Sequence, residues 1–240
     1  MGKKTIKKDK ILKHFDLLLD EVRSLVYSLD VWNQLTEIQN HSKHFKKYGG
    51  HLQHWLSQNY TYKVIVQIAK ITNPNYKKED VNFIKLLKEV SEKRYISFER
   101  FLESYDSPPE NERRIWNIVK DGPLETYNRN FTVEDAKESF ESKTGFPYNH
   151  TDFSEMINQD VQKFDEVFQK IKKLRHKKIA HLTTAEIKKV PTYADVEDCI
   201  NTIKAVAQKY KLIFYHSHDD FHYIDLNIRT VFEKAWMDQE

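Results

Sequence analysis

The segment from Arg175 to His181, which reads Arg-His-Lys-Lys-Ile-Ala-His, holds the side chains best suited to chemistry in this sequence. Cleaving RNA without a metal requires a base for the ribose 2′-hydroxyl, an acid for the leaving 5′-oxygen and a cation near phosphorus. Histidine titrates near neutral pH and can act as base or acid. Arginine offers a permanent charge and a planar fork that matches phosphate oxygens. These residue types are therefore sufficient for metal-independent cleavage of a phosphodiester, although a basic segment at the end of a helix needs no catalytic role.

The spacing of Arg175 and His181 limits how the two side chains could share one site. On a straight α-helix, at about 100° and 1.5 Å per residue, they diverge by about 120° and lie about 9 Å apart along the axis. Either the helix bends or ends between them, or a second copy of the chain completes the site across a two-fold axis. We favour the second copy and expect a homodimer.

Lysines surround this segment. Lys172 and Lys173 precede it, Lys177 and Lys178 lie within it, and five more lysines cluster between residues 3 and 10. A basic stripe attracts a polyanion such as RNA. The plainer interpretation is a solvated helix face whose cations lie near the negative end of the helix dipole. Because the formal net charge is only +3, the overall composition does not choose between the two.

Two groups of histidines have spacings that mimic metal sites. They are His41, His44, His51 and His54, and then His216, His218, Asp219, Asp220 and His222. Four imidazoles without cysteine would be an unusual structural zinc site, and Gly49-Gly50 separates the first group into two pairs. In the second group, Phe221 occupies the position where one metallohydrolase pattern needs a ligand. We therefore expect no metal and no cofactor, with a histidine-bound metal as the weaker alternative.

Cys199 is the single cysteine, which excludes an internal disulfide and a thiolate metal cluster. Its place beside Ile200 on an apolar helix face favours packing over nucleophilic chemistry. A glycine-rich phosphate loop is absent from the sequence, which argues against nucleotide hydrolysis of the P-loop type.

Apolar residues recur at spacings of three and four between a few glycine and proline breaks, which predicts an all-α fold. We expect helices over about 10–39, from Gly49-Gly50 to Pro74, and from about 79 to Pro108. A long helix capped by Asp152 or Ser154 leads into Arg175, and another follows Pro191. A four- or five-helix bundle is the simplest architecture.

We divide the chain into a helical bundle over residues 1–210 and a C-terminal extension over 211–240. The bundle carries an insertion over about 106–151, with short helices near 114–119 and 133–142, that caps it. The extension holds an apolar run at 212–215, a polar turn at 216–222 and an amphipathic helix that bears Trp236. No apolar run approaches membrane-spanning length and the start is too charged for a signal peptide, so we expect a cytoplasmic protein without a membrane partner.

The run from Leu174 to His181 resembles the signature of the HEPN superfamily (higher eukaryotes and prokaryotes nucleotide-binding). That signature is an arginine, commonly followed by a polar residue, and then a histidine after four to six intervening positions. Here five residues intervene, and His176 fills the polar position. The ending Ile179-Ala180-His181 resembles the abortive-infection AbiU-type branch. So does the earlier layout, with Leu35 and Asn40 before a long helix that ends at Asn73-Pro74. The resemblance covers about residues 11–208.

The resemblance implies a HEPN-like bundle that acts as a dimeric, metal-independent endoribonuclease in phage defence, by abortive infection, or as a toxin. It implies Arg175 and His181 as catalytic residues, with His176 orienting or assisting, and a 2′,3′-cyclic phosphate product. RNA, a second copy and an antitoxin or regulatory protein are the implied partners. Thr183 stands where one toxin subgroup has a tyrosine that its antitoxin modifies, so that modification is not expected. The alternative is a catalytically inactive HEPN dimer that binds a nucleotide, nucleic acid or protein.

Overall fold

The computed structural model describes residues 9–41, 50–75, 77, 79–106, 133–174, 191–217 and 221. All regular structure in these ranges is α-helical, which confirms the all-α prediction. The helices are α1 (Lys10–His41), α3 (Gly50–Thr72), α4 (Phe83–Glu92), α5 (Phe98–Asp106), α7 (Val133–Thr144), α8 (Ser154–Leu174) and α9 (Tyr193–Tyr215).

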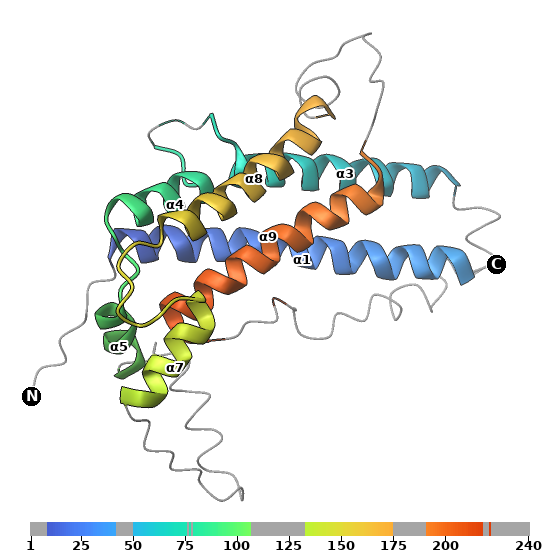
Figure 1. Cartoon of the computed structure of the whole chain (residues 1–240). Coiled ribbons are helices and arrows are strands. Elements are labelled where there is room, and N and C mark those ends of the chain that lie inside the picture. The colour runs from blue at the N-terminus through green and yellow to red at the C-terminus, as the bar shows by residue number, and fades with distance from the viewer. Residues whose placement is uncertain are drawn as a thin grey trace, which may run out of the picture.

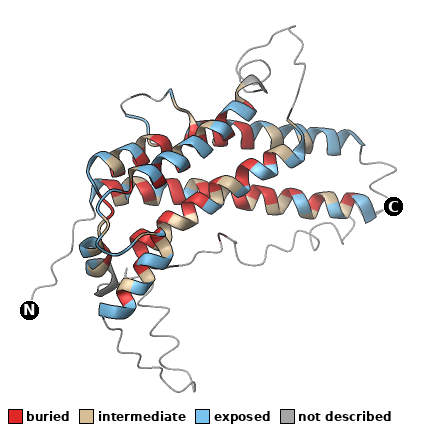
Figure 2. Cartoon of the chain, in the orientation of Figure 1, coloured by how far each residue is buried: buried red, intermediate tan, exposed pale blue. Residues whose placement is uncertain are grey.

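The long helices α1, α3, α8 and α9 form a bundle, and α4 packs beside α1 and α8 at one end (Figure 1). The buried residues lie on the parts of the helices that face one another (Figure 2) and form one hydrophobic core. Phe83 of α4 and Phe164 of α8 stack with ring centroids 4.8 Å apart, and both rings are fully buried. Each side chain of this size stabilises the fold by roughly 1.5–3 kcal/mol when it leaves water. The bundle is therefore held mainly by this apolar core.

Helix α1 matches its predicted span, with two additional residues at its C-terminal end. The apolar spacing that predicts this helix also predicts one buried stripe, formed by Leu12, Phe15, Leu18, Leu19, Val22, Leu25, Val26 and Leu29. Of these residues only Leu12 is partly exposed. The prediction for α3 is confirmed only in part. The apolar residues whose spacing predicts this helix include Leu52, Trp55, Ile65 and Ile68. Ile65 and Ile68 are buried, but Leu52 and Trp55 are exposed. The N-terminal half of α3 therefore projects an apolar face away from the core.

The single helix predicted from about residue 79 to Pro108 is wrong, because the chain breaks between α4 and α5. The Asn82 side chain caps the start of α4 by accepting a hydrogen bond from the Lys85 N–H. At the other end, Arg94 takes a left-handed conformation with φ 46°, and the Tyr95 N–H donates to the Val90 carbonyl. This pattern closes the helix without the glycine that normally marks it.

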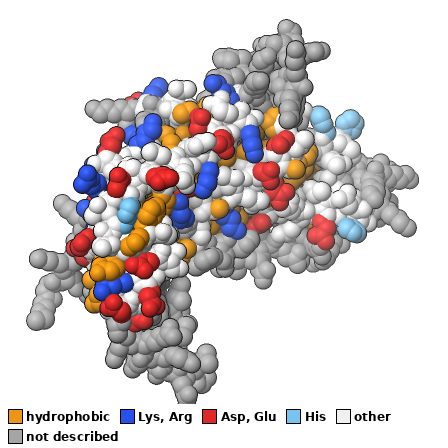
Figure 3. Space-filling model, in the orientation of Figure 1, with side chains coloured by type: hydrophobic (Ala, Val, Ile, Leu, Met, Phe, Trp, Pro, Cys, Tyr) orange, Lys and Arg blue, Asp and Glu red, His pale blue; other side chains and the backbone are white. Residues whose placement is uncertain are grey.

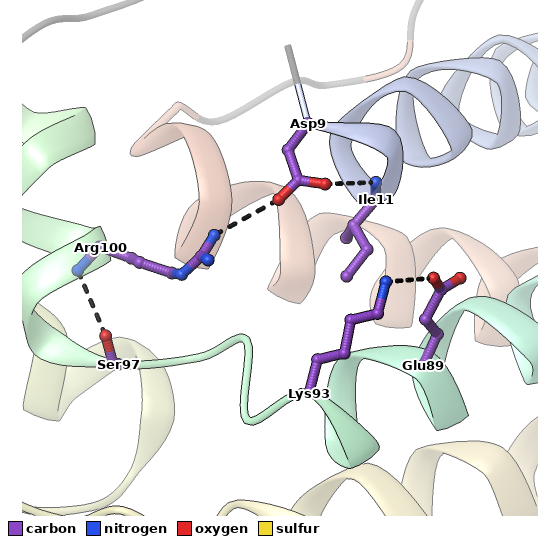
Figure 4. A network of polar contacts seen from close by, with 6 residues as sticks. All are labelled: Asp9, Ile11, Glu89, Lys93, Ser97 and Arg100. Atoms are coloured by element: carbon purple, nitrogen blue, oxygen red, sulfur yellow. Dashed lines mark hydrogen bonds and ion pairs between the residues drawn. The ribbon is translucent and has the colours of Figure 1, made fainter.

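A small group of polar contacts joins the break between α4 and α5 to the start of α1 (Figure 4). One oxygen of Asp9 accepts the Ile11 N–H at 3.1 Å, and the other lies 3.5 Å from the Arg100 guanidinium. Arg100 also lies over the Tyr95 ring at 4.1 Å. Since these charged groups are largely exposed, we assign them a positioning role and little stabilisation.

The structure describes residues 133–151 of the predicted insertion, and their helix α7 includes the piece predicted at 133–142. It packs against α5 and the C-terminal end of α9. Phe140 of α7 is fully buried against Phe101 of α5, with centroids 5.1 Å apart. Gly145 ends the helix at φ 78°, a conformation that favours glycine. The helix predicted at 114–119 lies outside the described residues.

Helix α9 continues through the apolar run that we had placed in the C-terminal extension. Phe214 and Tyr215 are buried, and the Tyr215 hydroxyl donates to Asp16 of α1 at 2.7 Å. The proposed boundary after residue 210 therefore falls inside a helix of the bundle. The rest of the domain division stays a prediction, and the helix predicted around Trp236 lies outside the described residues.

At the start of α8, Asp152 has the capping role that we predicted for Asp152 or Ser154. Its carboxylate accepts the Ser154 N–H at 2.9 Å. The hydrogen bond with the Ser154 side chain, followed by the one from this N–H, lowers the pKa of Asp152. None of the helices in the described ranges combines the length and the apolar character needed to cross a bilayer.

Candidate functional site

The predicted catalytic segment begins where α8 ends. Arg175, His176, Lys177, Lys178 and His181 lie outside the described residues, so the arrangement of their side chains stays a prediction. Their flanks are described. Helix α8 ends at Leu174, α9 starts at Tyr193, and the two helices pack together. The bundle thus fixes the helix that precedes residues 175–190 and the helix that follows them (Figure 1).

The two lysines predicted to precede the segment lie in the last turn of α8. Lys172 is partly exposed beside the fully buried Ile171, and Lys173 follows, with its side chain outside the described residues. A cation in the last helical turn is favourable because the exposed carbonyls there carry partial negative charge. This placement suits both the RNA-binding prediction and the solvated-face alternative.

A capping box fixes the start of α9. The Thr192 hydroxyl accepts the Asp195 N–H at 3.1 Å, and the Asp195 carboxylate accepts the Thr192 N–H at 2.8 Å. Such reciprocal bonds satisfy two backbone donors that a helix start otherwise leaves open. Residue 192 is therefore held at a defined position on the bundle.

An aromatic cluster lies at this same start of α9. The Tyr193 ring stacks on Trp32 of α1 at 5.1 Å, and Trp32 stacks on Tyr60 of α3 at 4.8 Å. The Tyr193 hydroxyl also hydrogen-bonds to Ser57 of α3. Trp32 is nearly buried, while Tyr193 is 48% exposed. The cluster ties three helices together and leaves the Tyr193 ring accessible at the start of α9.

Sequence reasoning placed Tyr193 on the apolar side of its helix and did not single out Trp32 or Tyr60. Trp32 continues the buried stripe of α1 three residues after Leu29, which was the available signal. Burial raises the pKa of Tyr60, and the nearby Glu197 carboxylate adds to that effect. The Tyr60 phenol is therefore a neutral hydrogen-bonding group near neutral pH.

A buried carboxylate joins α8 to α9 deeper in the bundle. Asp160 of α8 is 1% exposed and accepts hydrogen bonds from Lys163 at 2.9 Å and from the Tyr210 hydroxyl at 3.1 Å. Lys209 of α9 forms an ion pair with the same carboxylate. Burial, followed by the charge of Asp160, raises the pKa of Tyr210. Asp160 lies 15 residues before Arg175, about 22 Å along a helix, so we assign it to packing of the helix pair.

Cys199 is buried within α9, as predicted. Burial raises the pKa of its thiol to about 11, so the thiolate is scarce near neutral pH. The structure thus agrees with a packing role and offers no activated nucleophile at this position.

Exposed histidines of the first group lie near the C-terminal end of α1 and the N-terminal end of α3 (Figure 3). His41, His51 and His54 are described, and His44 lies outside the described residues. Among the described residues, no three or more His, Cys, Asp or Glu side chains form a group that could hold a metal ion.

His216, from the second group, caps the C-terminal end of α9 in a left-handed conformation with φ 56°. Its Nε2 donates to the Phe101 carbonyl at 3.0 Å, and its ring meets the Phe101 ring edge-on. Phe221 is also buried, while His218, Asp219, Asp220 and His222 lie outside the described residues. His216 therefore belongs to a packed junction and not to the solvated polar turn that we predicted.

The His216 junction predicts a pH-dependent stability. Burial, followed by the charge of Lys143, lowers the pKa of His216 to about 4. Below about pH 6.5 His216 is protonated in the unfolded chain but stays neutral in the folded chain, so the free energy of unfolding falls as the pH is lowered. The expected slope is up to about 1.4 kcal/mol per pH unit, ending near pH 4. Urea unfolding of the wild type and His216→Gln between pH 4 and 7 measures it, and parallel profiles would contradict the assignment.

Comparison with known proteins places this arrangement in a family. The sequence profile of the HEPN AbiU2 family matches residues 8–231, which include every described helix and the segment from Arg175 to His181. The chain belongs to this family of the HEPN class. No curated protein and no solved structure matches the chain. The resemblance to the AbiU-type branch is thereby confirmed.

Proposed function

We propose that this protein is a metal-independent endoribonuclease of the HEPN type that acts in the cytoplasm, in abortive infection of phage-infected cells or as a toxin. The observation that carries the proposal is the Arg175–His181 segment, which falls inside the family match directly after α8. Its arginine and histidines supply the charge and the proton-transfer groups that the reaction requires.

The proposed reaction is attack of the ribose 2′-oxygen on the adjacent phosphorus. His181 takes the 2′-hydroxyl proton or donates a proton to the leaving 5′-oxygen, and a second histidine is needed for the complementary transfer. Arg175 stabilises the charge on the phosphorane, and His176 orients or assists. The P–O5′ bond breaks, leaving a 2′,3′-cyclic phosphate and a free 5′-hydroxyl. The balance of protons requires no metal and no cofactor.

RNA binding is assigned to the basic side chains around the segment. Lys172, Lys173, Lys177 and Lys178 attract the phosphate backbone. Tyr193 supports the same assignment, because its partly exposed ring lies at the start of α9, where a nucleobase could stack. On one straight helix Arg175 and His181 would point in directions about 120° apart. We therefore infer that a second copy of the chain supplies part of the site.

The second candidate is a catalytically inactive HEPN dimer that binds a nucleotide, nucleic acid, or a protein such as an antitoxin. It would keep the basic helix end and the aromatic cluster without cleaving RNA. Growth arrest on expression, relieved by an alanine at Arg175 or His181, favours the enzyme over this alternative.

The direct test is incubation of the purified chain with a mixed pool of single-stranded and structured RNA, with and without an excess of chelator. We expect cleavage to be unchanged by the chelator and the products to end in a 2′,3′-cyclic phosphate, which mass spectrometry identifies. Cleavage that needs a divalent cation, or products with a 3′-hydroxyl end, would rule out the proposed chemistry. A chain that binds RNA but cleaves none would favour the second candidate.

A further inference from the structure

The outer face of α3 carries a row of apolar side chains that the bundle does not cover. Leu52, Trp55, Tyr62 and Val66 are 46%, 60%, 41% and 46% exposed. Together with the exposed Asn59 they lie at alternating spacings of three and four residues, so they form one continuous row, which we call the α3 stripe. Exposed apolar rows of this length are uncommon on monomeric proteins and mark interaction surfaces.

The α3 stripe is separate from the face that α3 gives to its own bundle. Val64, Ile65 and Ile68 are fully buried against the core, whereas Val66 between them is exposed. Figure 2 shows the exposed residues along the N-terminal part of α3. At its other end the stripe borders a shallow groove between α1 and α3, lined by Glu21, Ser24, Tyr62, Lys63, Val66, Gln67 and Lys70. Helix α3 therefore has one apolar face that packs into its own core and a second apolar face that is exposed to solvent.

The order of residues in the stripe is the same in both directions. It reads aliphatic, aromatic, Asn59, aromatic, aliphatic, so a two-fold antiparallel contact of the stripe with itself would place apolar side chains opposite apolar ones. The alternating spacing of three and four is that of a coiled-coil seam. In an antiparallel pairing centred on Asn59, Leu52 faces the partner's Val66 and Trp55 faces the partner's Tyr62.

Two further features favour a second copy over a different partner. The Asn59 side-chain amide donates one hydrogen bond to the Trp55 carbonyl of its own helix at 2.8 Å, and its oxygen and second amide hydrogen can pair with the same residue of the other copy. One such residue fixes the register of a seam. The run from His51 to Tyr62 contains no Lys, Arg, Asp or Glu, so two copies meet there without repulsion between like charges. A surface that recognises an acidic or basic partner would carry the complementary charges.

We propose that two copies of this chain associate through the α3 stripe, with their α3 helices antiparallel and the two-fold axis near Asn59. This inference deepens the proposed function, because a second copy is part of it, and it names the surface where the copies meet. Ser57, which bonds to Tyr193 at the start of α9, lies two residues from Asn59 and is therefore rotated by about 200° around α3, onto the side that faces the bundle core. The start of α9 thus lies level with the axis along α3, but on the side of the helix opposite the stripe.

Cysteine cross-linking tests the geometry without reading RNA cleavage. Asn59→Cys is expected to form a disulfide-linked dimer on mild oxidation, because the two positions meet at the axis. Leu52→Cys is expected to form no disulfide cross-link, because antiparallel helices hold the two copies of residue 52 about 21 Å apart. Gln53→Cys, exposed on the same helix but off the stripe, is the matched control, and the native Cys199 is 1% exposed. Cross-linking of Leu52→Cys, or none of Asn59→Cys, would overturn the proposal.

Sedimentation analysis provides the second measurement. Trp55→Glu places a carboxylate in the centre of the contact and is expected to weaken dimerisation by about 30-fold or more. Gln53→Glu adds the same charge to the same helix and is expected to leave dimerisation unchanged. A wild-type monomer, or a Trp55→Glu dimer as tight as the wild type, would contradict the interface. A dimer of the predicted geometry without any RNA cleavage would remove only the proposed function, whereas cleavage by a monomeric Trp55→Glu variant would exclude the two-copy site.

Discussion

Replacing Asp160 by alanine is expected to lower the free energy of unfolding by about 2–4 kcal/mol. The carboxylate is buried and accepts hydrogen bonds from Lys163 and Tyr210, with Lys209 as its ion-pair partner. The two lysine side chains are 52% and 28% exposed, so their ammonium groups can turn toward water. The Tyr210 hydroxyl is fully buried and has no such route. Most of the cost is therefore assigned to an unsatisfied hydroxyl, lost packing and a weakened α8–α9 contact.

Urea unfolding followed by circular dichroism measures this loss. Asp198→Ala, at an exposed carboxylate on α9, is the matched control and is expected to change stability by less than about 0.5 kcal/mol. In the Asp160→Ala background, Tyr210→Phe is expected to cost less than it does alone, because the hydroxyl has already lost its acceptor. An Asp160→Ala variant as stable as the Asp198→Ala control would show that the network does not hold the helices together.

Arg175→Ala and His181→Ala are each expected to reduce RNA cleavage strongly. Losing a positioned acid or base typically costs about 10²- to 10⁴-fold in rate, and losing a charge-stabilising donor costs about 10²- to 10³-fold. Rates are measured under single-turnover conditions, with the dimer confirmed for each variant. Lys88→Ala, an exposed lysine on α4, is the control and is expected to cleave like the wild type. Unchanged cleavage by His181→Ala would show that the site lies elsewhere.

Mixing the two inactive variants separates a shared site from one contained in a single chain. After exchange of subunits, about half of the dimers carry one intact Arg175 and one intact His181 on different copies. A site built from both copies recovers part of its activity in these mixed dimers. If each chain holds a complete site, the mixture stays as inactive as either variant, and the two-copy site is then excluded.

The sequence was sufficient for those parts of the fold that depend on local patterns. The apolar spacing of α1 predicted both its span and its buried face, because one side of that helix faces the core along most of its length. Pro191 and the Thr192–Asp195 pair similarly mark the start of α9. The family is also readable from the sequence, since the profile match rests on residue types. The candidate site itself was proposed from residue types alone and stays a prediction.

Other features were decided only by tertiary structure. The break after α4 was missed because Arg94, and not a glycine, takes the left-handed conformation. The left-handed conformation of Arg94 costs free energy, and we infer that the burial of Tyr95 and Ile96, which follow it, offsets this cost. The burial of Asp160 was equally hidden, since no local pattern distinguishes it from the exposed aspartates of the same chain. Such contacts depend on distant residues, and only the packed bundle brings Lys209 and Tyr210 to that carboxylate.

The exposed half of α3 illustrates the same limit. Its apolar spacing is that of a buried helix, and we read it as part of the core. Periodicity shows that a face avoids water, but not whether the chain itself or a second molecule covers it. The tertiary structure answers the first part by leaving Trp55 60% exposed. The sequence determined the helices, their apolar faces and the family, whereas the packing decided which faces remain free, because burial is a property of the whole bundle.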